Sequence, residues 1–213
     1  MLARTDGQKP DQYVIDAAMM QRCIRLSAQA IRDGEFPFAA MVCIGDEVLA
    51  EATNEVAKSS DVTQHAELLA ISRAQKALGR KELTDCTLYS NVEPCVMCSF
   101  PARETSIGRV IFAISSPKMG GFSRWAVLRD AGLSQAMPEA FGPPPEIIRG
   151  LLRREAEKVW WSWNPLIWSV IKYRGCFGGE EDVDVCEHLQ AMPAPSGLIQ
   201  RLLRLRRIHR KTA

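Results

Sequence analysis

The sequence predicts an α/β fold in which helices pack on the faces of a central sheet. Segments with apolar residues at helical spacing alternate along the chain with short apolar runs typical of strands. Hydrophobic residues make up 46% of the 213 residues and charged residues 24%, close to the globular average, so the core needs no disulfide staples. This length fits one compact domain with extensions.

The first predicted elements are a helix and a hairpin. From residue 11 to 33, apolar and small residues recur every three or four positions, and Gly34 follows as a helix stop. Two short apolar runs, 38–44 and 48–52, are joined by a Gly-Asp pair typical of tight turns.

The next elements repeat the alternation. An Ala- and Leu-rich helix is predicted over 64–78 and ends at Gly79. Strands are predicted over 86–92 and 109–114, with a helix between them. After the breaker GPPP, the sequence predicts a further helix over 146–163.

Charge and hydropathy exclude several classes of protein. Lys and Arg number 27 against 25 Asp and Glu, a net charge of +2, which argues against a strongly basic nucleic-acid coat. The N-terminal residues hold no apolar stretch long enough for a signal peptide, and the most hydrophobic segment, 159–171, is too short to span a bilayer. Seven cysteines without a secretory signal favour reduced thiols or metal ligands. We therefore expect a cytoplasmic protein that does not bind membranes.

The two ends of the chain differ from its body. We expect a polar lead-in over 1–10, and an acidic linker with a basic, Leu-bearing helix over 179–213, where the last fifteen residues hold six Lys or Arg and no acid. Such charge blocks are typical of solvated or disordered tails. Binding of RNA, or docking to a partner, is the alternative.

Two short strings carry the chemistry: HAE at 65–67 and PCVMC at 94–98. His65, Cys95 and Cys98 supply one imidazole and two thiolates, a donor set suited to zinc, and leave the fourth tetrahedral position free for water, as in catalytic sites. The two cysteines lie three residues apart, so one helical turn puts both sulfurs on the same side. The alternatives are a folding zinc or two buried cysteines.

These strings, HAE followed by PCxxC, resemble those of the cytidine/deoxycytidylate deaminase superfamily. The surrounding sequence is similar to the branch that holds tRNA adenosine deaminases and bacterial guanine deaminases, through Asn54, DVTQHAE, DCTLY, EPCVMC and IGRV. The resemblance covers about residues 16–114. It implies a mixed sheet of about five strands sandwiched between helices, with extra C-terminal helices, in a deaminase domain over 11–178 that forms a homodimer.

The resemblance also implies a mechanism. His65, Cys95 and Cys98 would hold zinc, which lowers the pKa of water so that hydroxide can attack the ring carbon bearing an exocyclic amine. Glu67 would move the proton from water to the ring nitrogen and the leaving ammonia.

Further site residues carried over from the resemblance contact the substrate. Asn54 matches a residue that hydrogen-bonds the substrate, and the Ala66 N–H and the backbone near Glu93 would complete the pocket. Phe38 resembles a residue of the free-nucleobase enzymes; it could stack on a base, or simply be a core aromatic.

Several features depart from the family pattern. Ala39 stands where many relatives have Gly, and Pro101 falls inside the helix after Cys98, where it should kink or shorten that helix. Trp125, in a segment that does not align, could face a ligand.

Four of the five tryptophans fall between 160 and 168, a pattern typical of core or of a dimer interface. The remaining cysteines are interpreted as small hydrophobes.

The nearly neutral body favours a small substrate over a polyanion. We expect deamination of a free nucleobase or nucleoside of guanine, adenine or cytosine type. A tRNA adenosine-to-inosine deaminase is the alternative, and a catalytically silent zinc-binding module is the second alternative.

Overall fold

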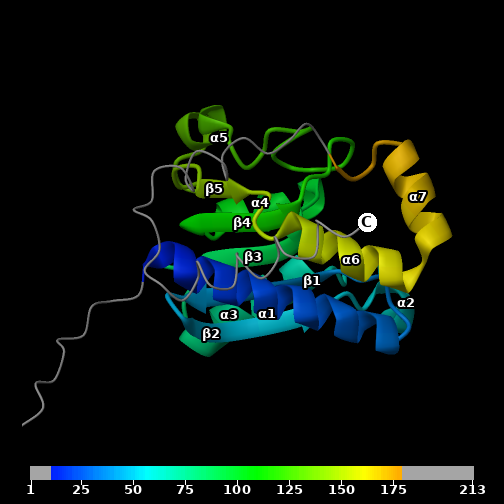
Figure 1. Ribbon diagram of the computed structural model, residues 1–213. Coiled ribbons are helices and arrows are strands. Elements are labelled where there is room, and N and C mark those ends of the chain that lie inside the picture. The colour runs from blue at the N-terminus through cyan, green and yellow to red at the C-terminus, as the bar shows by residue number, and fades with distance from the viewer. Residues whose placement is uncertain (1–10, 179–213) are drawn as a thin grey trace, which may run out of the picture.

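The computed structural model describes residues 11–178 (Figure 1). The predicted lead-in, acidic linker and basic tail lie outside the described residues. The elements are α1 (Gln12–Arg32), β1 (Ala39–Ile44), β2 (Glu47–Thr53), α2 (Val56–Ser59), α3 (Ala66–Leu78), β3 (Thr87–Val92), α4 (Val96–Glu104), β4 (Arg109–Ile114), α5 (Ala131–Ala136), β5 (Glu146–Arg149), α6 (Arg153–Trp163) and α7 (Pro165–Tyr173).

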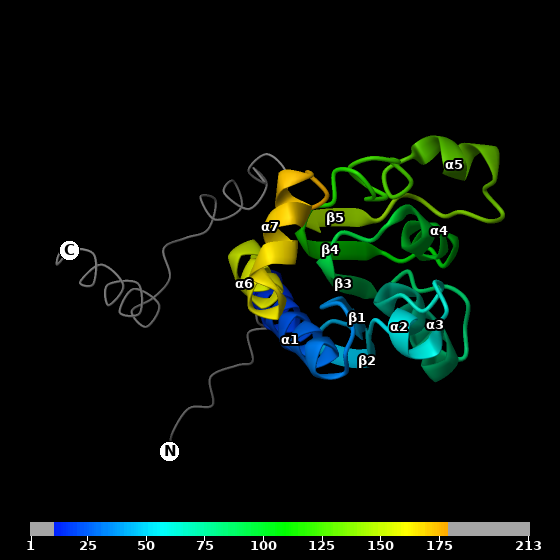
Figure 2. The same ribbon diagram turned by 90° about the vertical axis from the view of Figure 1, so that its right-hand side faces the viewer.

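The central sheet has five strands in the order β2-β1-β3-β4-β5. Strand β1 runs antiparallel to β2 and β3, while β3, β4 and β5 are parallel. Helices α1 and α6 cover one face and α3 and α4 the other, with α7 beside α6 (Figure 2). The predicted mixed sheet between helices is therefore confirmed.

Local sequence signals explain the first elements. The Asp11 carboxylate accepts a hydrogen bond from the Tyr13 N–H and caps α1, which ends before Gly34 at a positive φ of 82°. Gly45 makes the β1–β2 turn, also at positive φ. Helix α3 begins two residues later than predicted and ends before Gly79.

Two hydrophobic cores lie on opposite faces of the sheet. Alternate residues of β1 face them: Met41 and Cys43 pack in the core beneath α1 and α6, and Ala40 and Val42 in the core beneath α3 and α4. Cys23 and Cys86 are buried as well, consistent with their interpretation as small hydrophobes. No helix within 11–178 has the length and apolar character needed to cross a membrane.

The prediction of one helix over 146–163 is wrong. Residues 146–149 form β5, the edge strand, which pairs in parallel with β4. Gly150 and Leu152 then both adopt positive φ, which turns the chain before α6 begins. The β-branched pair Ile147-Ile148 suits this strand, and pairing with β4 outweighs the helical spacing of the sequence.

The tryptophan block lies mainly in the core, as expected. Trp160 is fully buried and stacks on Trp168, with ring centroids 5.6 Å apart. Trp161, in contrast, is 55% exposed.

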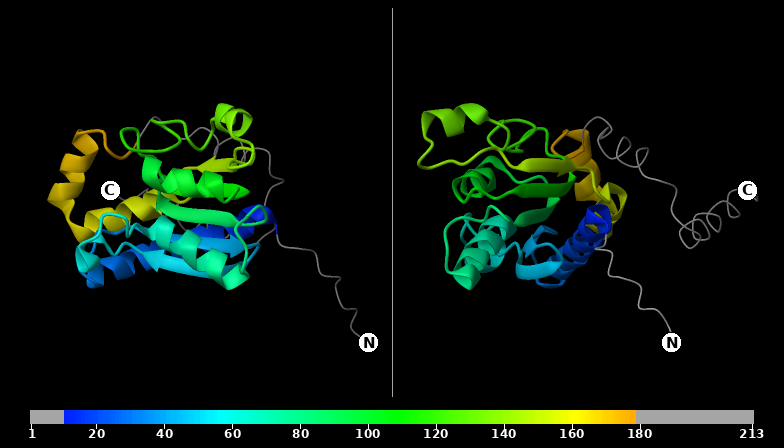
Figure 3. Two further views of the ribbon diagram at one scale, coloured as in Figure 1. Left: turned by 180° about the vertical axis from the view of Figure 1, so that it is seen from behind. Right: turned by 90° about the vertical axis from the view of Figure 1, so that its left-hand side faces the viewer.

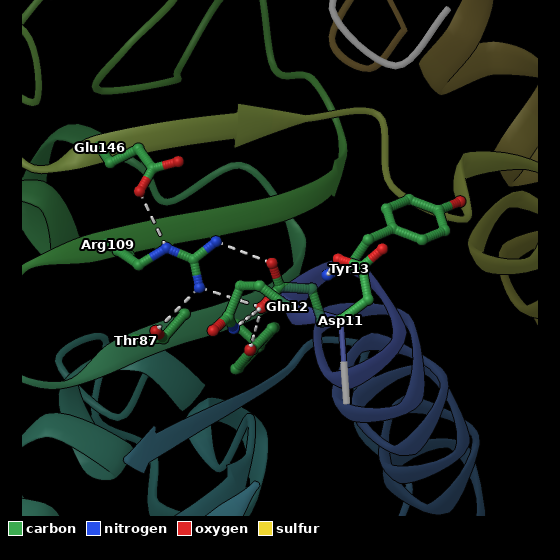
Figure 4. A network of polar contacts seen from close by, with 8 residues as sticks. Asp11, Gln12, Tyr13, Thr87, Arg109 and Glu146 are labelled. Carbon is green, nitrogen blue, oxygen red and sulfur yellow. Dashed lines mark hydrogen bonds and ion pairs between the residues drawn. The ribbon is translucent and has the colours of Figure 1, made fainter. Parts of the chain in front are cut away.

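A buried ion pair joins α1 to the sheet. The Asp16 carboxylate accepts hydrogen bonds from Arg109 Nη2 at 2.7 Å, Arg109 Nη1 at 3.0 Å and the Tyr89 hydroxyl at 2.6 Å. Arg109 also forms an ion pair with Glu146 on β5. Its guanidinium lies between that strand and the start of α1 (Figure 4). Burial alone would raise the pKa of Asp16, but the hydrogen bonds from Arg109, Tyr89 and Gln12 outweigh it and hold that pKa below its ordinary value.

We expect Asp16→Asn to lower the free energy of unfolding by about 3 kcal/mol, because it removes the buried carboxylate bonded to Arg109 and leaves that arginine only the exposed Glu146 as a charge partner. Because the pKa of Asp16 is lowered in the folded protein, its contribution to the free energy of unfolding is fully present above the ordinary aspartate pKa of about 3.9. It is lost as the pH falls through the lowered pKa, so the difference between variant and wild type should shrink in acid. Urea denaturation at several pH values measures this.

The matched control is Glu146→Gln, which removes the exposed partner of the same arginine. We expect it to cost about 0.5 kcal/mol or less. Equal effects of the two substitutions would contradict the dominant role of Asp16.

Candidate active site

The two motif strings lie at the starts of two helices on the same face of the sheet. His65 is the N-cap residue of α3 and Cys95 the N-cap residue of α4. These helices lie side by side when the molecule is seen from behind (Figure 3). The N-termini of these two helices therefore bring the two motif strings together.

Three side chains from these helix starts converge. His65 Nδ1 lies 3.6 Å from Cys95 Sγ and 3.4 Å from Cys98 Sγ, and the two sulfurs are 3.6 Å apart. Zinc bonds of about 2.3 Å to sulfur and about 2.0 Å to nitrogen put tetrahedral neighbours roughly 3.5–3.8 Å apart. Both the donor set and its spacing therefore fit a zinc ion. Within residues 11–178 this is the one group of its kind.

The electrostatics favour metal binding. Hydrogen bonds from Cys98 and His65 to the Cys95 sulfur lower the pKa of that thiol to about 4, against the opposing effect of burial. A thiolate is thus available at neutral pH even before a metal binds.

Glu67 lies beside the metal-binding group. Its Oε2 accepts from Cys98 Sγ at 3.5 Å, and its Oε1 accepts from Ser90 Oγ at 3.3 Å. Burial raises the pKa of Glu67, and the negative charge of Cys95 raises it further. Both effects favour the protonated form of the Glu67 carboxyl group.

A cavity opens beside this group. It brings together most of the site residues that the sequence predicted: the metal ligands His65 and Cys95, with Glu67, Phe38, Asn54 and Glu93. Ala66 and Cys98 do not line it. Four lining residues were not predicted: Val92, Ser116, Met119 and Phe177.

The additional wall residues come from parts of the chain without local signals. Ser116 and Met119 lie in the loop after β4, and Phe177 follows α7. The Phe177 ring packs edge-on against Phe38, with centroids 6.0 Å apart. Both are aromatic residues at the ends of apolar segments, which by itself does not distinguish a pocket wall from core.

Phe38 has contacts on both the cavity side and the core side, and its stacking on a base stays a prediction. It lines the cavity, and its ring also packs edge-on against the buried Trp160 at 4.9 Å. Trp125 does not line the cavity: it is 55% exposed and lies under the Arg124 guanidinium. Helix α4 runs through Pro101 to Glu104, so it does not end at the proline.

The side chain of Glu93 holds the loop after β4. Its carboxylate accepts four hydrogen bonds, from Ser116 N at 2.7 Å, Phe122 N at 3.0 Å, Ser123 N at 2.7 Å and Ser123 Oγ at 2.6 Å. A Cβ added to Gly120 would lie 1.9 Å from Glu93 Oε1, so only glycine fits there. The sequence predicted a pocket role for the backbone near Glu93; the structure adds this function of its carboxylate.

The same loop contacts the start of α4. Val96 N donates to Met119 O at 3.2 Å, and Gly121 N donates to Pro94 O at 2.9 Å. The hydrogen bonds to Glu93 therefore place a wall of the cavity and support the segment that carries Cys95.

A family model of the cytidine and deoxycytidylate deaminase zinc-binding region matches residues 14–114. The chain is 32% identical over 140 residues to the tRNA-specific adenosine deaminase of Bacillus subtilis, a match that covers 66% of this chain and 83% of that protein.

It is also 32% identical over 143 residues to the tRNA(Ile)-lysidine synthase of Deinococcus radiodurans, across 67% of this chain and 23% of that protein. The chain spans about a quarter of the length of the two lysidine synthases that it matches.

Two solved structures extend the comparison. One, from a study of A-to-I editing by tRNA:A34 deaminases, has a TM-score of 0.58 at 26% identity and is matched over 67% of this chain and 99% of its own. The other, a mutant of the protein NE0047 in complex with 8-azaguanine, has a TM-score of 0.59 at 26% identity, over 70% of this chain and 84% of its own.

We expect Glu93→Gln to lower the free energy of unfolding by about 2 kcal/mol and to weaken zinc binding. The Glu93 carboxylate accepts these hydrogen bonds with two oxygens, whereas an amide has only one acceptor oxygen. Urea denaturation and a zinc competition titration measure the two effects. Glu104→Gln, at an exposed residue paired with Lys81, is the matched control and should change neither. Unchanged zinc affinity in Glu93→Gln would show that the loop does not support the Cys95 segment.

Proposed function

Because the chain belongs to the cytidine and deoxycytidylate deaminase family, we propose that it is a zinc-dependent hydrolase that removes an exocyclic amino group, as ammonia, from a free nucleobase or nucleoside of guanine, adenine or cytosine type. The observation that carries the proposal is the placement of Glu67 beside the His65, Cys95 and Cys98 group, at a cavity lined also by Asn54 and Phe38.

The proposal gives each polar group a role. His65, Cys95 and Cys98 would hold zinc, which when bound supplies hydroxide at neutral pH by lowering the pKa of water. The Glu67 carboxylate would take the proton from the attacking water and deliver it to the ring nitrogen and the leaving amine. Ser90 Oγ lies 3.3 Å from Glu67 Oε1, while its shorter hydrogen bond goes to Val92 O at 2.6 Å.

The cavity walls support a planar, uncharged substrate. The apolar residues are Phe38, Val92, Met119 and Phe177, and neither Lys nor Arg lines the cavity among the described residues. The phosphate of a nucleotide would need a cationic or N–H partner. A neutral base or nucleoside therefore suits this cavity better than a nucleotide does.

The second candidate function is deamination of adenosine in tRNA. The relative from Bacillus subtilis is named a tRNA-specific adenosine deaminase, and one structural relative comes from a study of tRNA:A34 deaminases. The complex with 8-azaguanine, a purine-base analogue, supports the free-base function to a similar degree.

Further expectations from the resemblance are a homodimer, which analytical ultracentrifugation would test, and a deaminase domain over 11–178.

The experiment that tests the proposed function is ammonia release by the zinc-loaded protein. The panel contains guanine, adenine, cytosine, their nucleosides and a tRNA anticodon hairpin. We expect release from a free base or nucleoside. Release from the hairpin alone would establish the second candidate instead, and no release from any compound would contradict both and favour a binding module.

Glu67→Ala should retain the fold and one zinc ion per chain while turnover falls by about 100-fold or more, the scale expected for the loss of a general acid and base. Cys98→Ser should lose both zinc and turnover, because it removes a metal ligand. Zinc content by atomic absorption and ammonia release measure the two properties. Near-normal turnover in Glu67→Ala would contradict the role of Glu67 as general base and acid.

A further inference from the structure

The buried carboxylate of Glu35 lies outside the machinery described above. Glu35 is located between α1 and β1 and is only 3% exposed. Its Oε2 accepts from Asn54 Nδ2 at 2.8 Å and from Ala57 N at 3.2 Å, and its Oε1 accepts from Lys58 N at 2.7 Å. It therefore joins the cavity residue Asn54 to the first turn of α2.

These contacts determine the orientation of the Asn54 amide. Two of the three partners of Glu35 are backbone N–H groups, which only donate, and an ionised carboxylate only accepts. Asn54 must consequently turn its NH₂ group, and not its carbonyl oxygen, toward Glu35. The backbone of Asn54 is held as well, since its N–H donates to Phe38 O at 3.1 Å.

Asn54 lines the cavity beside Phe38 and Glu67. Glu35 engages one N–H of Nδ2, so Oδ1 is the acceptor that this amide retains for a ligand, beside the second N–H of Nδ2. An acceptor at this place discriminates strongly between ligands, because a ligand that presents another acceptor leaves two buried oxygens unpaired.

We propose that Glu35 is a positioning residue that fixes the Asn54 amide with Oδ1 available to the cavity, so that the site selects ligands with an N–H or O–H donor at that point. This inference rests on the proposed function, because it takes the ligand of the cavity to be the substrate. Glu35 also caps α2, and its test must separate that structural role from the orientation of Asn54.

A swap of hydrogen-bonding polarity provides this separation. In Glu35→Gln the amide at position 35 can donate to Asn54, which allows Asn54 to turn its NH₂ group into the cavity. Asn54→Asp alone puts two carboxylates against each other. The double variant E35Q/N54D restores a donor–acceptor pair, keeps the total charge of the wild type, and again presents an oxygen to the cavity.

With the panel compound that the wild type deaminates, we expect KM to rise about tenfold in each single variant, with a smaller change in kcat. KM should return to within about threefold of the wild type in the double variant. Glu82→Gln, the same substitution on an exposed side chain, should leave KM unchanged. Thermal denaturation and zinc content of all variants report the capping role separately.

Two kinetic results would overturn the proposal. One is a double variant whose KM is no better than that of the single variants, which is what a purely structural role of Glu35 produces. The other is an unchanged KM in Glu35→Gln.

A second measurement does not depend on turnover. In ¹⁵N NMR spectra, the side-chain amide pair of Asn54 is identified as the one absent from Asn54→Asp. A hydrogen bond to a carboxylate should shift one of its protons downfield and slow its exchange with water, and Glu35→Gln should reverse both effects. An amide pair that does not respond to Glu35→Gln would refute the orientation. If no panel compound is deaminated, the proposed function fails while this measurement still decides the role of Glu35.

Discussion

His65 and Cys95 begin two helices that pack on the same face of the sheet, and their side chains must lie within 4 Å of each other for one metal ion to contact both. This distance constrains the placement of α3 and α4 on β1 and β3. It also explains why small buried residues, such as Ala70 on α3 and Ala102 on α4, face the sheet and allow close packing. The geometry of the site therefore depends on how two helices pack.

Four buried carboxylates of this fold differ in the hydrogen bonds that they accept. Asp16, Glu35 and Glu93 each accept three or more short hydrogen bonds and join segments that are distant in the sequence. Glu67 differs, because its two side-chain contacts are long, at 3.3 and 3.5 Å, and burial raises its pKa. Three of these carboxylates therefore have short hydrogen bonds to several partners, whereas Glu67 has only long ones.

Residues outside the family match form part of the cavity. The match ends at residue 114, whereas Met119 lies in the following loop and Phe177 follows α7. The loop is held by Glu93, and Phe177 packs on Trp160 with ring centroids 5.0 Å apart. These elements shape the walls of the cavity but contribute no metal ligand.

The sequence by itself determined the features that depend on neighbours along the chain. Helix α1 and the β1–β2 hairpin follow from periodicity and glycine stops, and the donor set at 65–67 and 94–98 is complete in the sequence alone. Tertiary structure decided the rest: β5 in place of a helix, Phe177 in the wall, the hydrogen bonds of Glu93, and the contact of Glu35 with Asn54. The last two connect residues 19 or more positions apart. Their partners are backbone N–H groups, one serine hydroxyl and one side-chain amide, so no local pattern distinguishes them, and only the packing of the sheet and loops brings them together.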